Sequence, residues 1–173
     1  MPKIKTISVY SFDELDDCAK ETARAIFRND DCWLWQSDWW ASAQAFCRIA
    51  PIEIRSADYD AGHVSVRCDA PELSGLRAWK WLQNNEWFDL AARNKAGECT
   101  LTGFCGDCDL FDPIAALANK PLQVPELSQL FYECAQSWVF AARADCEYSY
   151  SDECIDELIC ANDYEFMENG RLA

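Results

Sequence analysis

Hydrophobic positions near the start of the chain recur first at every second residue and then at every third or fourth. Residues 3–10 alternate apolar and polar side chains and are rich in β-branched residues, as in a half-buried strand. From Leu15 to Ile26 the spacing is that of one buried helix face. Ser11 precedes this segment and Glu14 follows three residues later, which predicts a capping box. The predicted inward stripe is Leu15, Cys18, Ala19, Thr22 and Ile26.

A loop at residues 29–31 and then a run of aromatic residues predict a second helix that ends near Arg48. Its aromatic positions are Trp33, Trp35, Trp39, Trp40 and Phe46. Spacings of four and seven residues place pairs of these tryptophans on one helix face. Two interpretations stay open: the rings close a hydrophobic core, or they form an exposed patch for a partner. Stacking on single-stranded nucleic acid needs basic surroundings, which this sequence lacks.

Between residues 51 and 126 the predicted elements are short. Pro51 ends the second helix, because proline lacks the amide hydrogen that a helix interior needs. Asp112 and Pro113 have the residue types of a helix start, with Asp as the cap and Pro at the first helical position. The predicted order is strands at 52–54 and 63–68 around a loop at 56–62, helical spacing at 74–85 and 86–94, a short strand at 97–104, a turn at 105–109 and a helix at 112–118.

The longest predicted helix covers residues 127–144 and leads into an acidic block at residues 145–168. Ser151 predicts the cap of a further helix at 152–161, and a last strand or hairpin is expected around Asn169 and Gly170. The pattern contains no internal repeat and no domain linker. The sequence therefore predicts one α+β domain over residues 1–173, helix-rich with a small, mainly antiparallel sheet.

The acidic residues give the chain a formal charge of −15, from 30 Asp or Glu against 15 Lys or Arg. Nine of these acids, and no Lys or Arg, fall in the block at 145–168. Such a chain repels nucleic acid and anionic membranes and attracts basic surfaces. Solubility alone is the competing explanation, although a surface selected for solubility usually interleaves Lys with the acids.

The helix predicted at 152–161 separates an apolar side from an acidic side. Its apolar side consists of Cys154, Ile155, Leu158 and Ile159. Carboxylates four residues apart lie about 6 Å apart along a helix axis, and rows of them would imitate the charge of duplex phosphates. The alternative is a solvated face on a helix that docks through its apolar side. The candidate partner-binding residues are the acids of this face and of the first helical turn: Asp152, Glu153, Asp156, Glu157, Asp13, Glu14, Asp16 and Asp17.

The sequence contains eleven cysteines, so metal binding and thiol chemistry have to be considered. No apolar signal-peptide run precedes them, so we expect reduced thiols and a cytoplasmic protein. A zinc site needs four ligands, and spacing does not choose a fourth among Cys68, Cys134 and Cys146. We expect no metal or other cofactor, with a structural zinc ion as the alternative. The candidate ligands for such an ion are Cys99, Cys105 and Cys108.

Motifs that fix a catalytic chemistry are absent from the sequence. It contains no P-loop, GxGxxG, GxSxG or HExxH motif. A Cys–His hydrolase would have to use His63, the only histidine, without an orienting motif. Redox chemistry at Cys105-x2-Cys108 is opposed by neighbouring acids, which disfavour the thiolate. We therefore assign no catalytic residue and expect no enzymatic activity.

The two ends of the chain carry distinctive short stretches. The start reads Ile7-Ser-Val-Tyr-Ser-Phe-Asp-Glu-Leu, followed by Ala19-Lys20, and the end reads Ser151-Asp-Glu, Ala161-Asn-Asp-Tyr-Glu-Phe and Asn169-Gly-Arg. Both ends resemble a widespread group of small phage and prophage proteins, some of which are labelled antitoxins, and the middle is similar only in general pattern. The resemblance implies an accessory protein of a mobile element that acts in a bacterial cytoplasm. It brings no catalytic or binding residues to carry over.

Charge and resemblance together give three functional hypotheses. The leading one is an inhibitor of a bacterial defence system, of the anti-CRISPR or anti-restriction type, which presents an acidic, nucleic-acid-mimicking surface to a basic, nucleic-acid-binding protein. The partner is then a protein or complex, with no direct binding of nucleic acid or membrane, and the oligomeric state is open. The second hypothesis is an antitoxin that binds and neutralises a toxin protein. The third is a zinc-stabilised or thiol-dependent enzyme.

Overall fold

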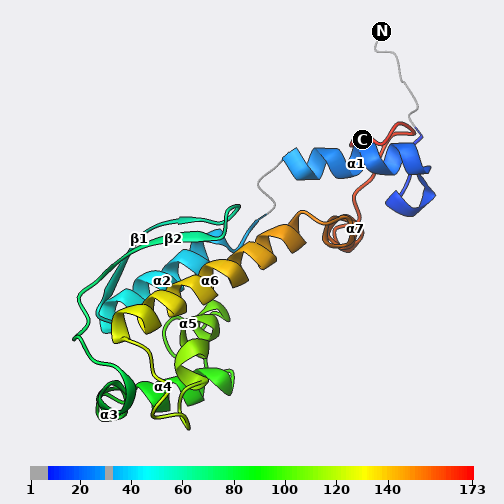
Figure 1. Cartoon of the computed structure of the whole chain (residues 1–173). Coiled ribbons are helices and arrows are strands. Elements are labelled where there is room, and N and C mark those ends of the chain that lie inside the picture. Colours follow the sequence, from blue (N-terminus) through cyan, green and yellow to red (C-terminus); the bar gives the residue numbers. More distant parts are fainter. Residues whose placement is uncertain (1–7, 30–32) are drawn as a thin grey trace. The chain divides into compact units, whose positions relative to one another are not determined.

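Helices dominate the computed structural model, which describes residues 8–29 and 33–173 (Figure 1). A single antiparallel pair of strands forms the sheet within these residues. The predicted class, helix-rich α+β with a small antiparallel sheet, is confirmed.

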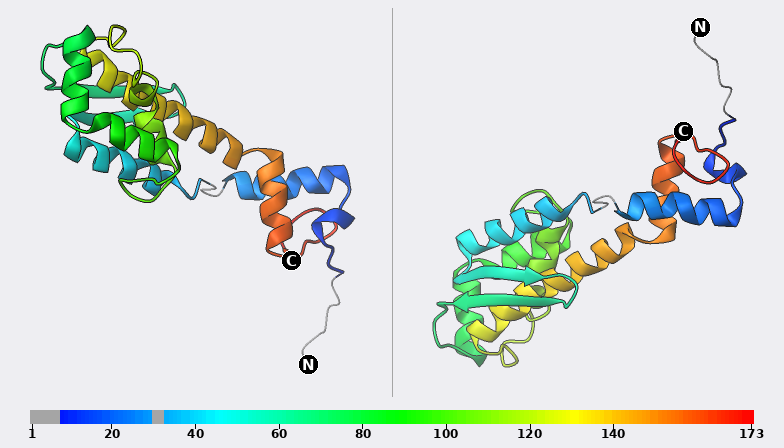
Figure 2. Two further views of the ribbon diagram at one scale, coloured as in Figure 1. Left: turned by 90° about the horizontal axis from the view of Figure 1, so that it is seen from below. Right: turned by 90° about the horizontal axis from the view of Figure 1, so that it is seen from above.

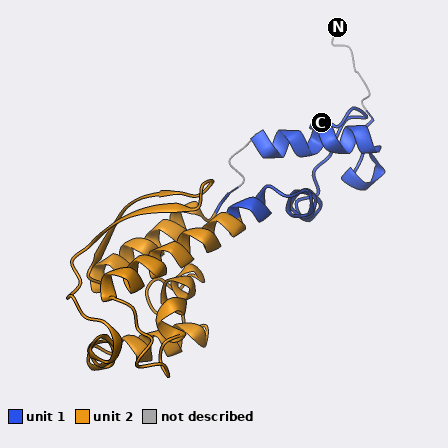
Figure 3. Cartoon of the chain, in the orientation of Figure 1, with its two compact units in different colours: residues 1–34, 146–173 blue, residues 35–145 orange. Residues whose placement is uncertain are grey.

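The chain forms two compact units, and Figure 3 colours them separately. Unit 1 comprises residues 1–34 and 146–173, and unit 2 comprises residues 35–145. The boundary falls near the end of the long helix α6 (Leu127–Ser149). That residues 1–173 act as one domain stays a prediction.

Unit 1 contains the 3-10 turn η1 (Phe12–Glu14) and the helices α1 (Asp17–Asn29) and α7 (Asp152–Ala161), with α7 crossing α1 (Figure 2). The capping box is present, because the Ser11 amide donates to the Glu14 carboxylate at 2.8 Å. It serves η1, however, and α1 begins separately where Asp16 accepts from the Ala19 amide at 2.8 Å. The one helix predicted here is therefore a short turn followed by a helix.

The buried face of α1 consists of Ala19, Ala23 and Phe27. Three positions of the predicted stripe are not buried, since Cys18 is exposed and Thr22 and Ile26 are half-buried. The break between η1 and α1 shifts the helix phase, so a pattern read through it selects the wrong side. The buried core of unit 1 is Phe12, Leu15, Ala19, Ala23, Phe27, Ile155, Ile159 and Phe166.

Phe166 joins the two ends of unit 1. It forms isolated antiparallel bridges with Tyr10 and with Leu172, and the bridge with Leu172 stands in place of the longer strand or hairpin predicted at the C-terminal end. Most of the strand predicted at residues 3–10, and most of the loop predicted at 29–31, lies outside the described residues.

Unit 2 contains four shorter helices, one hairpin and most of α6. The hairpin is the one predicted, with seven and six residues in its strands and a bulge between Ile54 and Ser56. Gly62, at its tip, lies against the Phe140 ring of α6, where a β-carbon would come within 2.6 Å. The elements are α2 (Gln36–Ile49), β1 (Ile52–Asp58), β2 (His63–Cys68), α3 (Gly75–Asn84), α4 (Trp87–Lys95) and α5 (Gly106–Ala115).

Aromatic rings fill the core of unit 2. Phe46 of α2 and Phe111 of α5 meet edge to face with centroids 5.4 Å apart, and Trp87 of α4 meets Phe131 of α6 at 5.1 Å. The indole N–H of Trp138 donates to the Trp39 carbonyl at 3.0 Å, which satisfies the polar end of a fully buried ring.

Residues 97–118 differ most from the prediction. Residues 97–104 form turns and bends, not a strand. Of the turn predicted at 105–109, only Cys105 lies in a turn, and residues 106–109 begin α5. Pro113, expected at a helix start, lies inside α5. Buried Asp107 provides the reason: its carboxylate accepts from the amides of Leu101, Thr102 and Gly103 at 2.7–3.3 Å and so holds the segment as a loop against the start of α5.

Candidate functional site

The acidic side of α7 faces two arginines of α1. Ser151 caps α7 by accepting from the Cys154 amide at 3.2 Å, and Ile155 and Ile159 are buried, as predicted. Arg24 holds Asp156 through two hydrogen bonds of 2.7 Å, and Arg28 pairs with Asp152. These four residues are called the α1–α7 charge cluster below. Half of the acidic face is therefore neutralised within unit 1.

Electrostatics in this cluster favour the charged forms of the arginines. The pKa of Arg24 is raised first by its hydrogen bond to Asp156, and the pKa of Arg28 first by its hydrogen bond to Glu21. The sequence analysis did not predict that Arg24 and Arg28 pair with the acids of α7. A signal was present, because two bases four residues apart match two acids four residues apart.

Two acids of the first helical turn have local structural roles. Glu14 accepts from the Ser11 amide and hydroxyl, and the amide hydrogen bond is the main cause of its lowered pKa. Asp16 accepts from the Ala19 amide at the start of α1. Their carboxylates are committed to these turns and are poor candidates for contacting a partner.

The other four predicted acids present exposed carboxylates. Asp13, Asp17, Glu153 and Glu157 are all exposed. Within the described residues, no Lys or Arg forms an ion pair with any of them. Glu157 lies close to Tyr148, whose pKa is raised first by the charge of Glu157. Four of the eight predicted residues thus have carboxylates that neither pair with an arginine nor accept an amide hydrogen bond at a turn.

Negative charge is concentrated in unit 1. Residues 1–34 and 146–173 hold 15 acids against 6 bases, whereas the longer unit 2 holds 15 against 9. Of the bases in unit 1, Arg24 and Arg28 are paired, and the Lys20 ammonium lies 5.6 Å from the Phe12 ring centroid. The larger part of the carboxylate surplus therefore lies on the smaller unit.

The three cysteines proposed as weak metal candidates lie around the loop before α5. The sulfurs of Cys99 and Cys108 are 3.8 Å apart, and Cys105 is the N-cap residue of α5. Of the alternatives for a fourth ligand, Cys134 is fully buried. Across residues 8–29 and 33–173, no group of three or more Cys, His, Asp or Glu side chains is placed to hold a metal ion.

Thiolates are disfavoured around this loop. Burial raises the pKa of Cys108 to about 11, with a further contribution from its contact with Cys99. Burial and the charge of Asp109 raise the pKa of Cys105. Cys105-x2-Cys108 does stand at a helix N-terminus, the place that thiol redox motifs favour, but neither thiol has the lowered pKa of a reactive cysteine. The only histidine, His63, is exposed at the start of β2.

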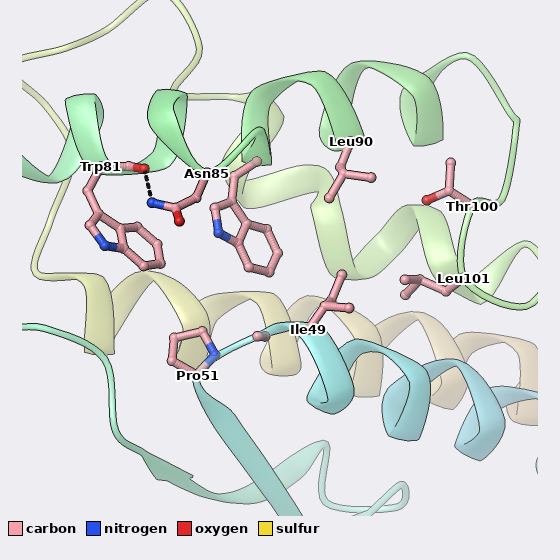
Figure 4. A pocket seen from close by; sticks show the side chains of 9 residues that line it. Ile49, Pro51, Trp81, Asn85, Leu90, Thr100 and Leu101 are labelled. Atoms are coloured by element: carbon pink, nitrogen blue, oxygen red, sulfur yellow. Dashed lines mark hydrogen bonds between the residues drawn. The ribbon is translucent and has the colours of Figure 1, made fainter.

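A pocket of about 470 Å³, which the sequence did not predict, opens between α2, the α3–α4 turn and the loop before α5 (Figure 4). Asn85 donates its side-chain amide to the Trp81 carbonyl at 2.8 Å and so turns its polar group along the wall. None of the lining residues is titratable, so the pocket offers shape and apolar surface but no acid or base. They are Ile49, Ala50, Pro51, Trp81, Asn85, Trp87, Leu90, Thr100 and Leu101.

Some tryptophans of the second helical segment close the core, and one is exposed at the surface, so each of the two interpretations holds for part of the run. Trp33 and Trp39 are buried and Trp40 is half-buried, which agrees with core closure. Trp35 is 53% exposed and stacks on Phe104 with centroids 6.2 Å apart. One ring of the run is thus available at the surface.

Two general findings complete the description of the chain. Among the helices of the described residues, none combines the length and apolar character that a membrane crossing needs. Comparison with known proteins finds no matching family model, no similar curated protein and no similar solved structure.

Proposed function

We propose that this chain binds a basic protein partner through the carboxylates of unit 1, and that the partner is a nucleic-acid-binding protein of a bacterial defence system. The observation that carries the proposal is the charge surplus of unit 1, which remains after Arg24 and Arg28 are paired internally. A surface of this kind attracts proteins whose own ligand is a polyanion.

The resemblance of both chain ends to phage and prophage proteins supports the second half of the proposal. A mobile element gains from blocking restriction or CRISPR enzymes, and these enzymes expose basic channels for nucleic acid. An acidic protein can occupy such a channel without being a substrate. On this proposal the protein acts in the bacterial cytoplasm and inhibits by occupancy, not by catalysis.

The contact surface is narrower than the sequence implied. Asp152 and Asp156 already bond to arginines, so a partner would have to compete for them. Glu153 and Glu157 lie one turn apart on α7, are exposed, and bond to no cation of the described residues. We expect these two glutamates, with Asp13 and Asp17, to make the main charge contacts.

The test is a charge reversal with a matched control. Glu153→Lys with Glu157→Lys raises the net charge by four and leaves the charge cluster intact. Glu72→Lys with Glu126→Lys makes the same change in net charge at exposed acids of unit 2. Each variant is expressed in cells that carry a restriction or CRISPR system, and the survival of challenging phage is counted.

Wild type and the unit 2 variant are expected to protect the phage, and the α7 variant to lose most of that protection. A purified target should be released from immobilised wild type by duplex DNA and by raised salt, because its contacts are charge-to-charge. Equal protection by all three proteins, or binding that duplex DNA and salt leave unchanged, would contradict the proposal.

A further inference from the structure

Three thiols meet where the loop after α4 reaches the N-terminus of α5, and they belong to no part of the proposed partner surface. Cys99 and Cys108 have their sulfurs 3.8 Å apart, and both side chains are partly accessible. A disulfide has its sulfurs about 2 Å apart. The two thiols therefore need to approach by less than 2 Å to bond.

The sequence motif and the geometry select different pairs. By spacing, Cys105-x2-Cys108 is the expected redox pair. In the structure, the thiol within hydrogen-bonding distance of Cys108 is Cys99, nine residues earlier, because Asp107 folds the loop back on α5. Cys105 is the exposed N-cap residue of α5.

The two thiols differ in how they are held. Cys99 lies in the loop between α4 and α5, and its thiol makes a long contact of 3.7 Å with the Gly97 carbonyl. Cys108 is held more firmly, since it lies in the first turn of α5 and its thiol donates to the Asn94 carbonyl at 3.1 Å. To close the 3.8 Å distance between the sulfurs, Cys99 therefore has to move more than Cys108.

We propose that Cys99 and Cys108 are a modification site that forms a reversible intrachain disulfide with a small disulfide oxidant, and that this bond fixes one wall of the apolar pocket. In the first step one thiolate attacks the oxidant, bonds to one of its sulfurs and releases the other as a thiol. In the second step the remaining protein thiolate displaces the second oxidant sulfur. One oxidant disulfide is reduced to two thiols, and the two protein thiols give up two electrons and two protons.

Cys99 is joined to the pocket wall through the backbone. Thr100 and Leu101 line the pocket and follow Cys99 immediately. Thr100 is held by Asn94, whose side chain accepts from its amide at 3.0 Å and donates to its hydroxyl at 2.7 Å. The disulfide removes the thiol hydrogen that Cys108 donates to Asn94 and replaces it with a covalent tie between the loop and α5.

Reactivity at the site should be slow near neutral pH. Burial raises the pKa of Cys108 to about 11, so little of it is thiolate at pH 7. The site therefore responds to sustained oxidation and does not act as a fast redox catalyst. Reaction with the oxidant is expected to accelerate as the pH rises toward 9.

The test oxidises the full chain, fully reduced beforehand, with oxidised glutathione and then blocks free thiols with a maleimide. Trypsin leaves Cys99, Cys105 and Cys108 on one peptide, because no Lys or Arg lies between residues 96 and 119. Cleavage after Leu101 and Phe104 by chymotrypsin, and before Asp107 by an Asp-specific protease, separates all three for mass spectrometry.

The expected result is a Cys99–Cys108 peptide and the loss of two maleimide-reactive thiols. Cys105→Ser, the matched control, should keep this product, while Cys99→Ser and Cys108→Ser should each lose it with unchanged far-UV circular dichroism. A Cys105–Cys108 product, loss of the bond in Cys105→Ser, or oxidation only at cysteines outside residues 99–108 would each overturn the assignment.

Amide hydrogen exchange tests the effect on the pocket. Exchange at residues 100–103 should slow by about tenfold in the oxidised protein, since the loop opens less often when it is tied at Cys99. Exchange in residues 127–139 of α6 should not change. Unaltered exchange at residues 100–103 in protein shown to carry the bond would refute the pocket part of the proposal.

Discussion

In unit 1 the helices α1 and α7 meet through charged side chains as well as apolar ones, whereas in unit 2 the helices meet through aromatic rings. Arg24 and Arg28 bond to Asp156 and Asp152 at the edge of the small unit 1 core. In unit 2, the rings of Phe46, Trp87, Phe111 and Phe131 contact one another. Interactions that salt weakens are thus prominent in one unit, and interactions that salt leaves intact in the other.

Buried polar groups also differ between the units. Asp107 and Asn94 of unit 2 are fully buried, and each organises a loop through several hydrogen bonds. Unit 1 instead uses polar groups near its surface, such as the Ser11–Glu14 box and the Ser151 cap. Seven of the eight tryptophans lie in unit 2, so tryptophan fluorescence follows that unit while far-UV circular dichroism follows both.

The largest expected difference in stability is between alanine substitutions at two glycines that both have positive φ. At Gly170 in unit 1, φ is +78° and a β-carbon would lie 2.0 Å from the Ala19 carbonyl oxygen, whereas at Gly97 in unit 2, φ is +84° and the space is open. Gly170→Ala should lower the free energy of unfolding of unit 1 by about 3 kcal/mol or more, because strain and overlap add. Gly97→Ala should cost about 1 kcal/mol. Chemical denaturation followed by circular dichroism measures both, and equal costs would disprove the close approach at Ala19.

Asp107→Ala is the corresponding change in unit 2. It removes the acceptor of three amides and the Thr102 hydroxyl, and should cost about 3 kcal/mol. Fluorescence-monitored urea denaturation should show the loss. Glu72→Ala, at an exposed acid of the same unit, is the control and should change stability by less than about 0.5 kcal/mol. A small effect at Asp107 would mean that its loop is held by other contacts.

Asp109→Asn should make unit 2 more stable at neutral pH. Burial first, and then the charge of Asp112, raise the Asp109 pKa from 3.8 to about 6. Because the folded carboxyl binds its proton more tightly than the unfolded one, stability falls as the pH rises from about 4 to about 6, and the penalty is complete above that.

At pH 7 the gain from Asp109→Asn should be about 1–2 kcal/mol, after allowance for partial exposure, and little of it should remain at pH 4. Denaturation at a series of pH values measures this difference. Asp89→Asn, an exposed acid of α4, provides the control. A gain that does not depend on pH would rule out titration of Asp109 as its source.

Asp156→Asn tests the charge cluster of unit 1 and has the smallest expected effect. It weakens the bidentate ion pair with Arg24, in which the Arg24 side chain is 20% exposed and the Asp156 side chain 32% exposed. The free energy of unfolding should fall by about 1 kcal/mol at low salt. Glu98→Gln breaks the more exposed ion pair with Arg93 in unit 2 and should leave the free energy of unfolding almost unchanged. Thermal unfolding at low and high salt should show the Asp156 cost shrinking with salt. A cost that salt leaves unchanged would point to packing as its origin.

Features that depend on neighbouring residues could be predicted from the sequence. The α7 helix with its Ser151 cap, the hairpin after Pro51 and the Ser11–Glu14 box each follow from residues within a few positions of one another. Among the candidate site residues, the exposed positions of Glu153 and Glu157 followed from the helix period in the same way.

Features that depend on distant partners could not be predicted. Arg24 and Asp156 are 132 residues apart. The matching spacing of two bases and two acids is compatible with their pairing but does not show that α1 and α7 are neighbours. Residues 97–104 alternate like a strand, but the Asp107 carboxylate overrides the pattern by binding their amides. The pocket needed three separated segments to be brought together, and no local pattern marks it.

The arrangement of unit 1 has a consequence for the order in which the protein is made. Its core joins Ala19 and Phe27 near the start of the chain to Ile155, Ile159 and Phe166 near the end. During translation, α1 therefore has no α7 to pack against until all of unit 2 has been synthesised. Residues 35–145 have their own aromatic core and can fold first. A chain truncated after residue 145 should therefore contain a protease-resistant unit 2 and a protease-sensitive α1, whereas both should be protected in the full chain.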